Sequence, residues 1–204
     1  MNIGVLVSGR GSNLAAILKD IERGAISGAE VKVVISNDPS AKALRVAERH
    51  GVKALALVQG ASTRQDYDER LLEALVQNGV RPGEGLVLLA GFMKILSRGF
   101  VERFAGRILN IHPSLLPAFP GVRAQKQAIS YGVKVSGCTV HFVVPEVDAG
   151  PIVLQRTVPV RDGDDEARLS SRILRQEHIA YPLAVKLFVE GKLKVEGRTV
   201  RVGI

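Results

Sequence analysis

The chain has 204 residues, of which 46% are hydrophobic, so it can bury a sizeable core and suits a single domain over 1–204. Its net charge of +8 indicates attraction for an anion, such as a phosphate, a polyglutamate tail or a nucleic acid, or simply a soluble basic surface. With 4% aromatic residues and no dense basic block, a nucleic-acid stacking platform is poorly supported.

Features that the sequence lacks indicate the cellular compartment of the protein. Cys138 is the single cysteine, which excludes an intramolecular disulfide and is typical of a reducing setting. The N-terminal residues show no signal-peptide pattern. The longest uncharged apolar run, 85–93, is far shorter than the roughly 20 residues of a membrane-spanning helix. We therefore expect a cytoplasmic protein without a membrane partner.

Strands and helices are expected to alternate through the first 110 residues. Short apolar runs predict strands at 2–8, 31–36, 53–58 and 86–90, and a further strand from 108 onward. Apolar residues at helical spacing predict helices that begin at Ser12 or Asn13, at 41 and at a Ser62–Gln65 capping box, with a loop at 91–97. This alternation predicts a doubly wound, Rossmann-like α/β sheet that is mostly parallel.

The second half has a different pattern, which predicts an antiparallel C-terminal extension of the sheet. A helix is expected at 123–131, and the short turn at 145–151 joins two strands, 134–144 and 152–160. A helix then begins at Asp164 or Asp165. Pro182 is expected to end or kink this helix, with a last helical piece at 183–189 and a hairpin at 192–202.

Three unusual segments follow predicted strands: 9–13, 91–96 and 110–121. Ligands of doubly wound sheets bind beyond the carboxyl ends of the strands. Since the three segments are expected at the same edge of the sheet, we predict that they converge on one ligand site.

The first of these segments is a glycine turn between a strand and a helix. Gly9 and Gly11 allow a tight turn and a close approach of a ligand, and a helix N-terminus directs free N–H groups and a dipole toward a phosphate. The segment is neither a Walker loop nor a complete dinucleotide pattern, because position 14 is Leu. Phosphate binding and a mere tight turn both remain open.

The third segment, 110–121, carries the strongest signal for chemistry. Asn110 and His112 are two apart on a predicted strand, so both side chains leave the same face, and Pro113 ends the ladder. An amide and an imidazolium on one face can stabilise an oxyanion. A nearby carboxylate, for which Asp148 is the candidate, would raise the pKa of the imidazole above about 6.5. A buried, hydrogen-bonded structural histidine is the alternative for His112.

The remaining candidates give weaker signals. No pair of the four histidines has metal-ligand spacing, so no metal site is expected. His50 is expected at the surface, and His178 to be structural. Ser114 has no evident base partner, and Cys138, within a strand, is expected to pack rather than react.

Several motifs together resemble the phosphoribosylglycinamide formyltransferase family. They cover nearly the whole chain in the expected order: SGRGSNL at 8–14, LAGFMKIL at 89–96, ILNIHPSLLPAFPG at 108–121, VHF at 140–142, DAGP at 148–151, QEH at 176–178 and YP at 181–182. The run from Asn110 to Pro117 is specific to folate-dependent formyl transfer. Two differences lie outside the proposed catalytic residues: Arg123 and Gln125 stand where the family often has histidines, and Lys94 where arginine is common.

The resemblance implies a role for each matching residue. Residues 1–110 would bind phosphate or nucleotide, and residues 111–204 would bind folate and catalyse. The implied catalytic residues are Asn110, His112 and Asp148, and the implied phosphate site is Gly11, Ser12 and Asn13. Glu177 would lie near the ribose and amine of the ribonucleotide. The implied folate contacts are Arg64, Met93, Lys94, Ile95, Leu96, Asn110 and His141.

The implied reaction moves the formyl group of the co-substrate 10-formyltetrahydrofolate to the amine of phosphoribosylglycinamide, in purine synthesis and without a metal. The expected partners are these two small molecules and no nucleic acid, and the enzyme would be a monomer or a homodimer. Methionyl-tRNA formyltransferase usually adds a C-terminal barrel, whereas about fifteen residues follow Val189 here. Formyltetrahydrofolate deformylase usually adds an N-terminal regulatory domain. A basic nucleotide- or RNA-binding module is the non-enzymatic alternative.

Overall fold

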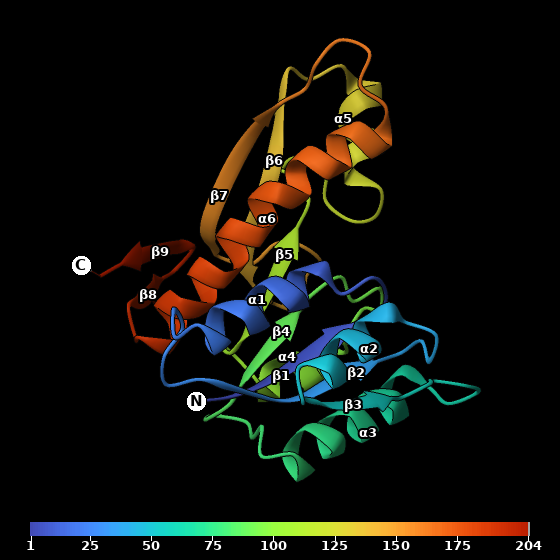
Figure 1. The fold of residues 1–204 in the computed structure, drawn as a ribbon, viewed down its shortest axis with the longest axis vertical. Helices are drawn as coiled ribbons and strands as arrows, with labels where there is room; N and C mark the ends of the chain where they lie inside the picture. The colour runs from blue at the N-terminus through green and yellow to red at the C-terminus, as the bar shows by residue number, and fades with distance from the viewer. Residues whose placement is uncertain (204) are drawn as a thin grey trace.

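Residues 1–203, which the computed structural model describes, form one nine-stranded sheet with helices on both faces (Figure 1). The strands are β1 (Asn2–Val7), β2 (Glu30–Ser36), β3 (Lys53–Ala56), β4 (Leu86–Leu89), β5 (Ile108–His112), β6 (Val135–Phe142), β7 (Ile152–Pro159), β8 (Leu193–Glu196) and β9 (Thr199–Val202). The helices are α1 (Ser12–Glu22), α2 (Lys42–Arg49), α3 (Arg64–Gln77), α4 (Arg98–Arg103), α5 (Ala124–Tyr131) and α6 (Glu166–Val189).

The strand order is β3-β2-β1-β4-β5-β6-β7-β9-β8. The strands from β3 to β5 are mutually parallel, β6 is antiparallel to both of its neighbours, and β9 lies parallel to β7 through Ile152 and Thr199. This arrangement confirms the predicted fold, a mostly parallel doubly wound sheet with an antiparallel extension. The strand order reverses between β1 and β4, where sheets of this kind bind ligands at the carboxyl edge.

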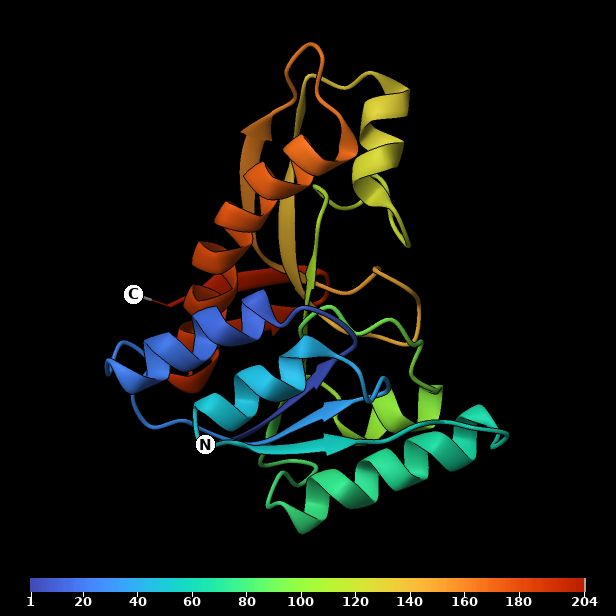
Figure 2. The same ribbon diagram turned by 45° about the vertical axis from the view of Figure 1, so that its right-hand side comes forward.

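The sheet buries a separate hydrophobic core on each face. Helices α1, α2 and α6 cover one face, and α3 and α4 cover the other, as Figure 2 shows for α1 and α2 opposite α3. Strand β4 is buried on both sides, which agrees with its uninterrupted apolar sequence. No helix within residues 1–203 is long and apolar enough to cross a bilayer.

Local details differ from the predicted elements in four places. Gly11, rather than a Ser12 or Asn13 side chain, precedes the first turn of α1. The capping box of α3 is formed by Thr63 and Asp66 and not by the predicted Ser62 and Gln65. The Thr63 side chain accepts from the Asp66 N–H, and the Asp66 side chain accepts from the Thr63 N–H. Helix α4 lies just after the segment predicted as a loop and is capped by the Ser97 side chain. Its six residues are too few to show a clear helical period.

The fourth difference is that α6 continues through Pro182 for 24 residues. A proline removes one intrahelical hydrogen bond and normally kinks or breaks a helix. Here Tyr181 and Ala184, on either side of Pro182, are fully buried against the sheet. Tertiary packing therefore keeps the last two turns helical.

Tyr181 fastens α6 to the two strands that lead to the site. Its hydroxyl lies 3.0 Å from the carbonyl oxygen of Leu89 on β4 and 2.9 Å from that of Leu109 on β5, with the side chain fully buried. This one donor bridges neighbouring strands near their carboxyl ends and so helps to hold β5 in place.

We expect Tyr181→Phe to lower the free energy of unfolding by about 1–2 kcal/mol, because two buried carbonyl groups lose a donor. Urea denaturation followed by circular dichroism measures this change. Tyr131→Phe is the matched control, since Tyr131 is 80% exposed, and it should change stability by less than about 0.5 kcal/mol. Equal losses in the two variants would contradict the assigned role of Tyr181.

Candidate active site

Asn110 and His141 face each other across the first antiparallel pair of the sheet. Asn110 on β5 pairs in register with His141 on β6, and Asn110 Nδ2 lies 3.1 Å from His141 Nε2. His141 Nδ1 lies 2.8 Å from the Phe142 carbonyl, which can only accept a hydrogen bond. His141 therefore carries its proton on Nδ1 and accepts from the Asn110 amide at Nε2.

The protonation of His141 determines how the Asn110 amide is oriented. Burial lowers the pKa of His141, although the Phe142 carbonyl and the Asp148 carboxylate act in the opposite sense. The ring is thus neutral near pH 7, and one N–H of the Asn110 amide is engaged while the second remains available. His141 Nε2 also lies 3.7 Å from Asp148 Oδ1. That separation is too long for a hydrogen bond, and a neutral ring makes no ion pair with the carboxylate.

His112 has an acceptor opposite each ring nitrogen. Its Nδ1 lies 3.4 Å from Asp148 Oδ2, and its Nε2 lies 2.9 Å from the carbonyl oxygen of Phe119. The side chain is 6% exposed, so water offers it few alternative partners. Each ring nitrogen therefore faces an oxygen that can accept a hydrogen bond.

Asp148 is held in place by the backbone of its own turn and by a hydrogen bond from Gly121. Its backbone is left-handed, with φ 52°, and its Oδ2 accepts a 2.7 Å hydrogen bond from the Gly121 N–H. Gly150 brings the turn close to β6, because a Cβ at this position would lie 1.8 Å from the Phe142 carbonyl oxygen. The structure therefore brings Asp148 together with Asn110 and His112, residues that are far away in the sequence.

Segment 113–123, which contains three prolines, lies against His112 and Asp148 through Phe119 and Gly121. Within this segment, Ser114 Oγ donates to the Ala118 carbonyl at 2.5 Å. Gln127, on α5, donates to the Val122 carbonyl at 2.9 Å. The segment therefore makes two direct hydrogen bonds to the candidate residues. Nothing in the sequence indicated the contact to the Phe119 carbonyl, because every residue has a backbone carbonyl.

The glycine turn lies at the carboxyl end of β1, where it starts α1. Gly11 has a left-handed backbone with φ 79°, and a Cβ there would lie 2.7 Å from Ala43 Cα. Asn13 Nδ2 donates a 2.7 Å hydrogen bond to Glu177 Oε2 on α6. Asn13 Oδ1 is buried and has no hydrogen-bond partner within residues 1–203. Glu177, predicted near the ribonucleotide, is thus joined directly to the predicted phosphate turn.

Glu177 and Arg10 set the electrostatics of this turn. Burial raises the pKa of Glu177, while the hydrogen bond from Asn13 and the charge of Arg10 lower it. Glu177 is 7% exposed, whereas the Arg10 side chain is open to solvent. Arg10 was not among the predicted site residues, although a cation between two turn glycines is a usable signal for an anion site.

The segment 91–96 reaches the same edge of the sheet. The Met93 N–H donates to Ser8 Oγ at 2.8 Å, which ties this segment to the end of β1. Lys94 Nζ donates to Gln59 Oε1 at 2.6 Å, just before Arg64 begins α3. Met93 and Ile95 are 74% and 54% exposed. These open apolar side chains suit a flat organic ligand, whereas Leu96 is buried in the core.

Apart from segment 91–96 and Arg64, the predicted site residues form two clusters. Asn110, His112, His141 and Asp148 form one cluster, and Gly11, Ser12, Asn13 and Glu177 form a second around the start of α1. Within residues 1–203, no group of three or more His, Cys, Asp or Glu side chains could hold a metal ion. Cys138 is fully buried, and burial raises the pKa of its thiol to about 12.

Comparison with known proteins gives the family of this chain. Residues 1–185 match the family model described as formyl transferase, so the chain belongs to the formyl transferase family. Phosphoribosylglycinamide formyltransferase of Escherichia coli strain K12 is 43% identical over 96% of this chain and 90% of its own length.

Solved structures give the same picture. Glycinamide ribonucleotide transformylase 1 of Symbiobacterium toebii is 50% identical with a TM-score of 0.96, over 100% of this chain and 94% of its own. Formyltetrahydrofolate deformylase of Burkholderia mallei is 30% identical with a TM-score of 0.87, over 100% of this chain and 70% of its own. The fold is therefore shared by proteins named for two different reactions.

We expect Gly11→Ala to lower the free energy of unfolding by about 2 kcal/mol or more, because alanine must adopt a left-handed backbone and its Cβ meets Ala43. Gly9→Ala is the matched control in the same turn, since a Cβ at Gly9 has no atom within 4 Å. Urea denaturation of both variants measures the difference. A Gly11→Ala protein as stable as Gly9→Ala would contradict the close packing of this turn.

Proposed function

We propose that the protein transfers the formyl group of 10-formyltetrahydrofolate to the amine of 5-phosphoribosylglycinamide, a step of de novo purine biosynthesis. The observation that carries this proposal is the convergence of Asn110, His112 and Asp148 at the end of β5. It occurs in a chain whose similar proteins include a phosphoribosylglycinamide formyltransferase and a glycinamide ribonucleotide transformylase. Both substrates are small molecules, and the proposed reaction uses no metal or nucleic acid and takes place in the cytoplasm.

The two substrates occupy the two ends of the site. The backbone N–H groups of Gly11, Ser12 and Asn13 hold the phosphate at the start of α1, next to the open Arg10. Glu177 accepts from the ribose or amine, and a ligand donor can complete the unpartnered Asn13 Oδ1. The folate lies along Met93, Lys94, Ile95 and Leu96, with Arg64 farther out and Asn110 and His141 at the reacting end.

The side chains at the end of β5 then stabilise the charge that develops during transfer. The neutral amine of the ribonucleotide attacks the formyl carbon, and the carbonyl oxygen becomes an oxyanion. The free N–H of the Asn110 amide and the His112 imidazolium donate to this oxyanion. Asp148 holds His112 charged and oriented, and helps to order a water that carries a proton from the amine to the departing folate nitrogen.

The Phe119 carbonyl has a part in this scheme because it accepts from His112 Nε2 at 2.9 Å. A substrate oxygen that takes this hydrogen bond replaces the Phe119 carbonyl. Segment 113–123 therefore shifts when the oxyanion binds at Nε2, whereas it stays in place when the oxyanion binds at Nδ1, beside Asp148.

The second candidate function is hydrolysis of 10-formyltetrahydrofolate, which the similarity to the Burkholderia mallei deformylase favours. The two reactions differ only in the acceptor, an amine or water. The Asn13–Glu177 contact at the glycine turn favours a ribonucleotide acceptor, because it joins the proposed phosphate site directly to a buried carboxylate.

An acceptor assay separates the two reactions. Purified protein is given 10-formyltetrahydrofolate with phosphoribosylglycinamide, initiator methionyl-tRNA or no acceptor, and tetrahydrofolate release is followed by absorbance. We expect release to depend on phosphoribosylglycinamide. Release at the same rate without any acceptor would establish the deformylase, and release only with the tRNA would establish methionyl-tRNA formyl transfer.

Substitution of either oxyanion donor tests the mechanism. We expect Asn110→Ala and His112→Ala each to lower kcat by about 100- to 1000-fold, since each removes one donor to the developing charge. His50→Ala, at the end of α2 and outside the site, should keep the original kcat. Circular dichroism and melting temperature check that the fold is retained. Wild-type turnover in either site variant would contradict the assignment.

A further inference from the structure

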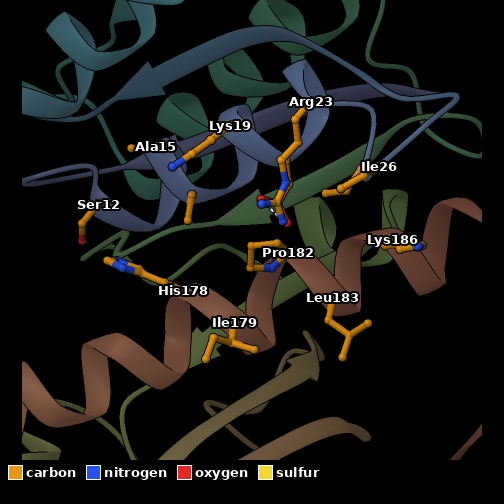
Figure 3. A pocket seen from close by; sticks show the side chains of 13 residues that line it. Ser12, Ala15, Lys19, Arg23, Ile26, His178, Ile179, Pro182, Leu183 and Lys186 are labelled. Carbon is orange, nitrogen blue, oxygen red and sulfur yellow. Dashed lines mark ion pairs between the residues drawn. The ribbon is translucent and has the colours of Figure 1, made fainter.

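The antiparallel extension of the sheet carries a row of polar side chains on the face that α6 does not cover. Cys138 and Val140 on β6 belong to the core that α6 covers, so Thr139, between them, points to the opposite face. His112, Thr139 and Gln155 are paired in register across β5, β6 and β7. The groove of about 660 Å³ between α1 and α6, which Figure 3 shows, lies among the helices of the other face. The polar row is therefore separate from that groove.

The hydroxyl of Thr139 uses its full capacity for hydrogen bonds. Thr139 is fully buried. Its Oγ1 donates to the Ser114 carbonyl at 2.7 Å and accepts from the Leu116 N–H at 3.0 Å. The same oxygen accepts from Gln155 Nε2 at 3.0 Å. A hydroxyl has one proton and two lone pairs, so no capacity is left for another partner.

Gln155 completes the attachment of Leu116 to the sheet. Its Nε2 donates to the Leu116 carbonyl at 2.9 Å, so side chains of β6 and β7 bind both backbone polar groups of Leu116. Gly137 on β6 leaves room for the neighbouring Leu115, because a Cβ at Gly137 would lie 2.8 Å from Leu115 Cδ2. The first residues of segment 113–123 are thus docked on the polar face of the extension.

The docked residues lead to His112 through Ser114 and Phe119. Ser114 is fully buried, and its Oγ lies 2.5 Å from the Ala118 carbonyl and 3.3 Å from that of Phe119. The Phe119 carbonyl in turn lies 2.9 Å from His112 Nε2. Phe119 has a left-handed backbone with φ 54°, which a bulky residue keeps only where the surrounding contacts hold it. The bonds from Thr139 to the same segment are among those contacts.

We infer that Thr139 and Gln155 are positioning residues for the proposed formyl transfer. They hold the start of segment 113–123 on β6 and β7, and this segment supplies the backbone groups that bind His112 and Asp148. Within residues 1–203, neither side chain makes a hydrogen bond to those two residues, so both act through the segment. The effect on turnover rests on the proposed function, whereas the effect on the segment is independent of any reaction.

Exchange of the Gly121 N–H with water, measured by NMR, reports on the segment without a substrate. Thr139→Val keeps the side-chain shape but removes the hydroxyl. We expect it to speed exchange at Gly121 by about tenfold, because two buried backbone groups of the segment lose their partner. Thr139→Ser retains a hydroxyl and should restore the original rate. The Val143 N–H, bonded to the Ile108 carbonyl at 2.9 Å, is the internal reference and should not change.

Kinetics of the proposed reaction give the second measurement. Thr139→Val should lower kcat by about tenfold and leave KM for both substrates nearly unchanged, because it moves groups at the reacting centre. Gln155→Leu should lower kcat by about threefold, since Gln155 is exposed and water can replace its amide. Thr139→Ser should recover the original kcat.

Thr157→Val is the matched control. It makes the same substitution on β7, at an exposed side chain that has no hydrogen bond within residues 1–203. This variant should keep both the original kcat and the original exchange rate at Gly121. Melting temperatures check that every variant folds.

The combined results separate positioning from general stability and from the proposed function. Faster exchange at Gly121 alone, with a lower kcat and rescue by Thr139→Ser, supports the inference. Equal acceleration at Gly121 and Val143, unchanged exchange at Gly121, or an unchanged kcat in Thr139→Val would overturn it. If the original protein transfers no formyl group, faster exchange at Gly121 would still support the docking by Thr139, and the proposed function would be the part that is wrong.

Discussion

The hydrogen bond between Asn110 and His141 is the interaction on which the candidate site depends. It links β5, the last parallel strand, to β6, the first antiparallel one. Because His141 gives its Nδ1 proton to the Phe142 carbonyl, its Nε2 can only accept, and this orients the Asn110 amide. A charged His141 would repel that amide N–H. The burial that lowers the pKa of His141 is therefore part of the site, since it keeps the neutral ring that the Asn110 amide requires.

The change from parallel to antiparallel pairing at β5 explains why the candidate residues meet. Parallel strands deliver the glycine turn, segment 91–96 and the end of β5 to one edge of the sheet. The antiparallel β6 runs back along β5, so its last residues, Val140 to Phe142, pair with Ile111, Asn110 and Leu109. The turn that carries Asp148 follows β6 directly, and Gly150 allows it to fold back onto that strand.

Much of the fold could be predicted because its signals are local and repetitive. Apolar runs and helical spacing located the five parallel strands, the antiparallel extension and most helices. The predictions that were wrong concern features that depend on tertiary contacts or on a short element. Helix α6 continues through Pro182 because the residues on either side of the proline pack against the sheet, and α4 has only six residues. In the site, the spacing of Asn110 and His112 predicted that their side chains leave the same face of the strand. The sequence could not place Asp148 beside His112, since that contact depends on a left-handed backbone and on strand register.

Segment 113–123 satisfies the polar groups of the site in the absence of a substrate. His112 would otherwise hold a buried N–H without an acceptor, and such a group is costly. The Phe119 carbonyl supplies the acceptor, and the Gly121 N–H supplies a donor to Asp148. The segment thus provides an acceptor for the imidazole and a donor for the carboxylate, which are the two kinds of contact that a carbonyl substrate and an ordered water would make. Exchange of these internal partners for substrate groups keeps the number of hydrogen bonds nearly constant.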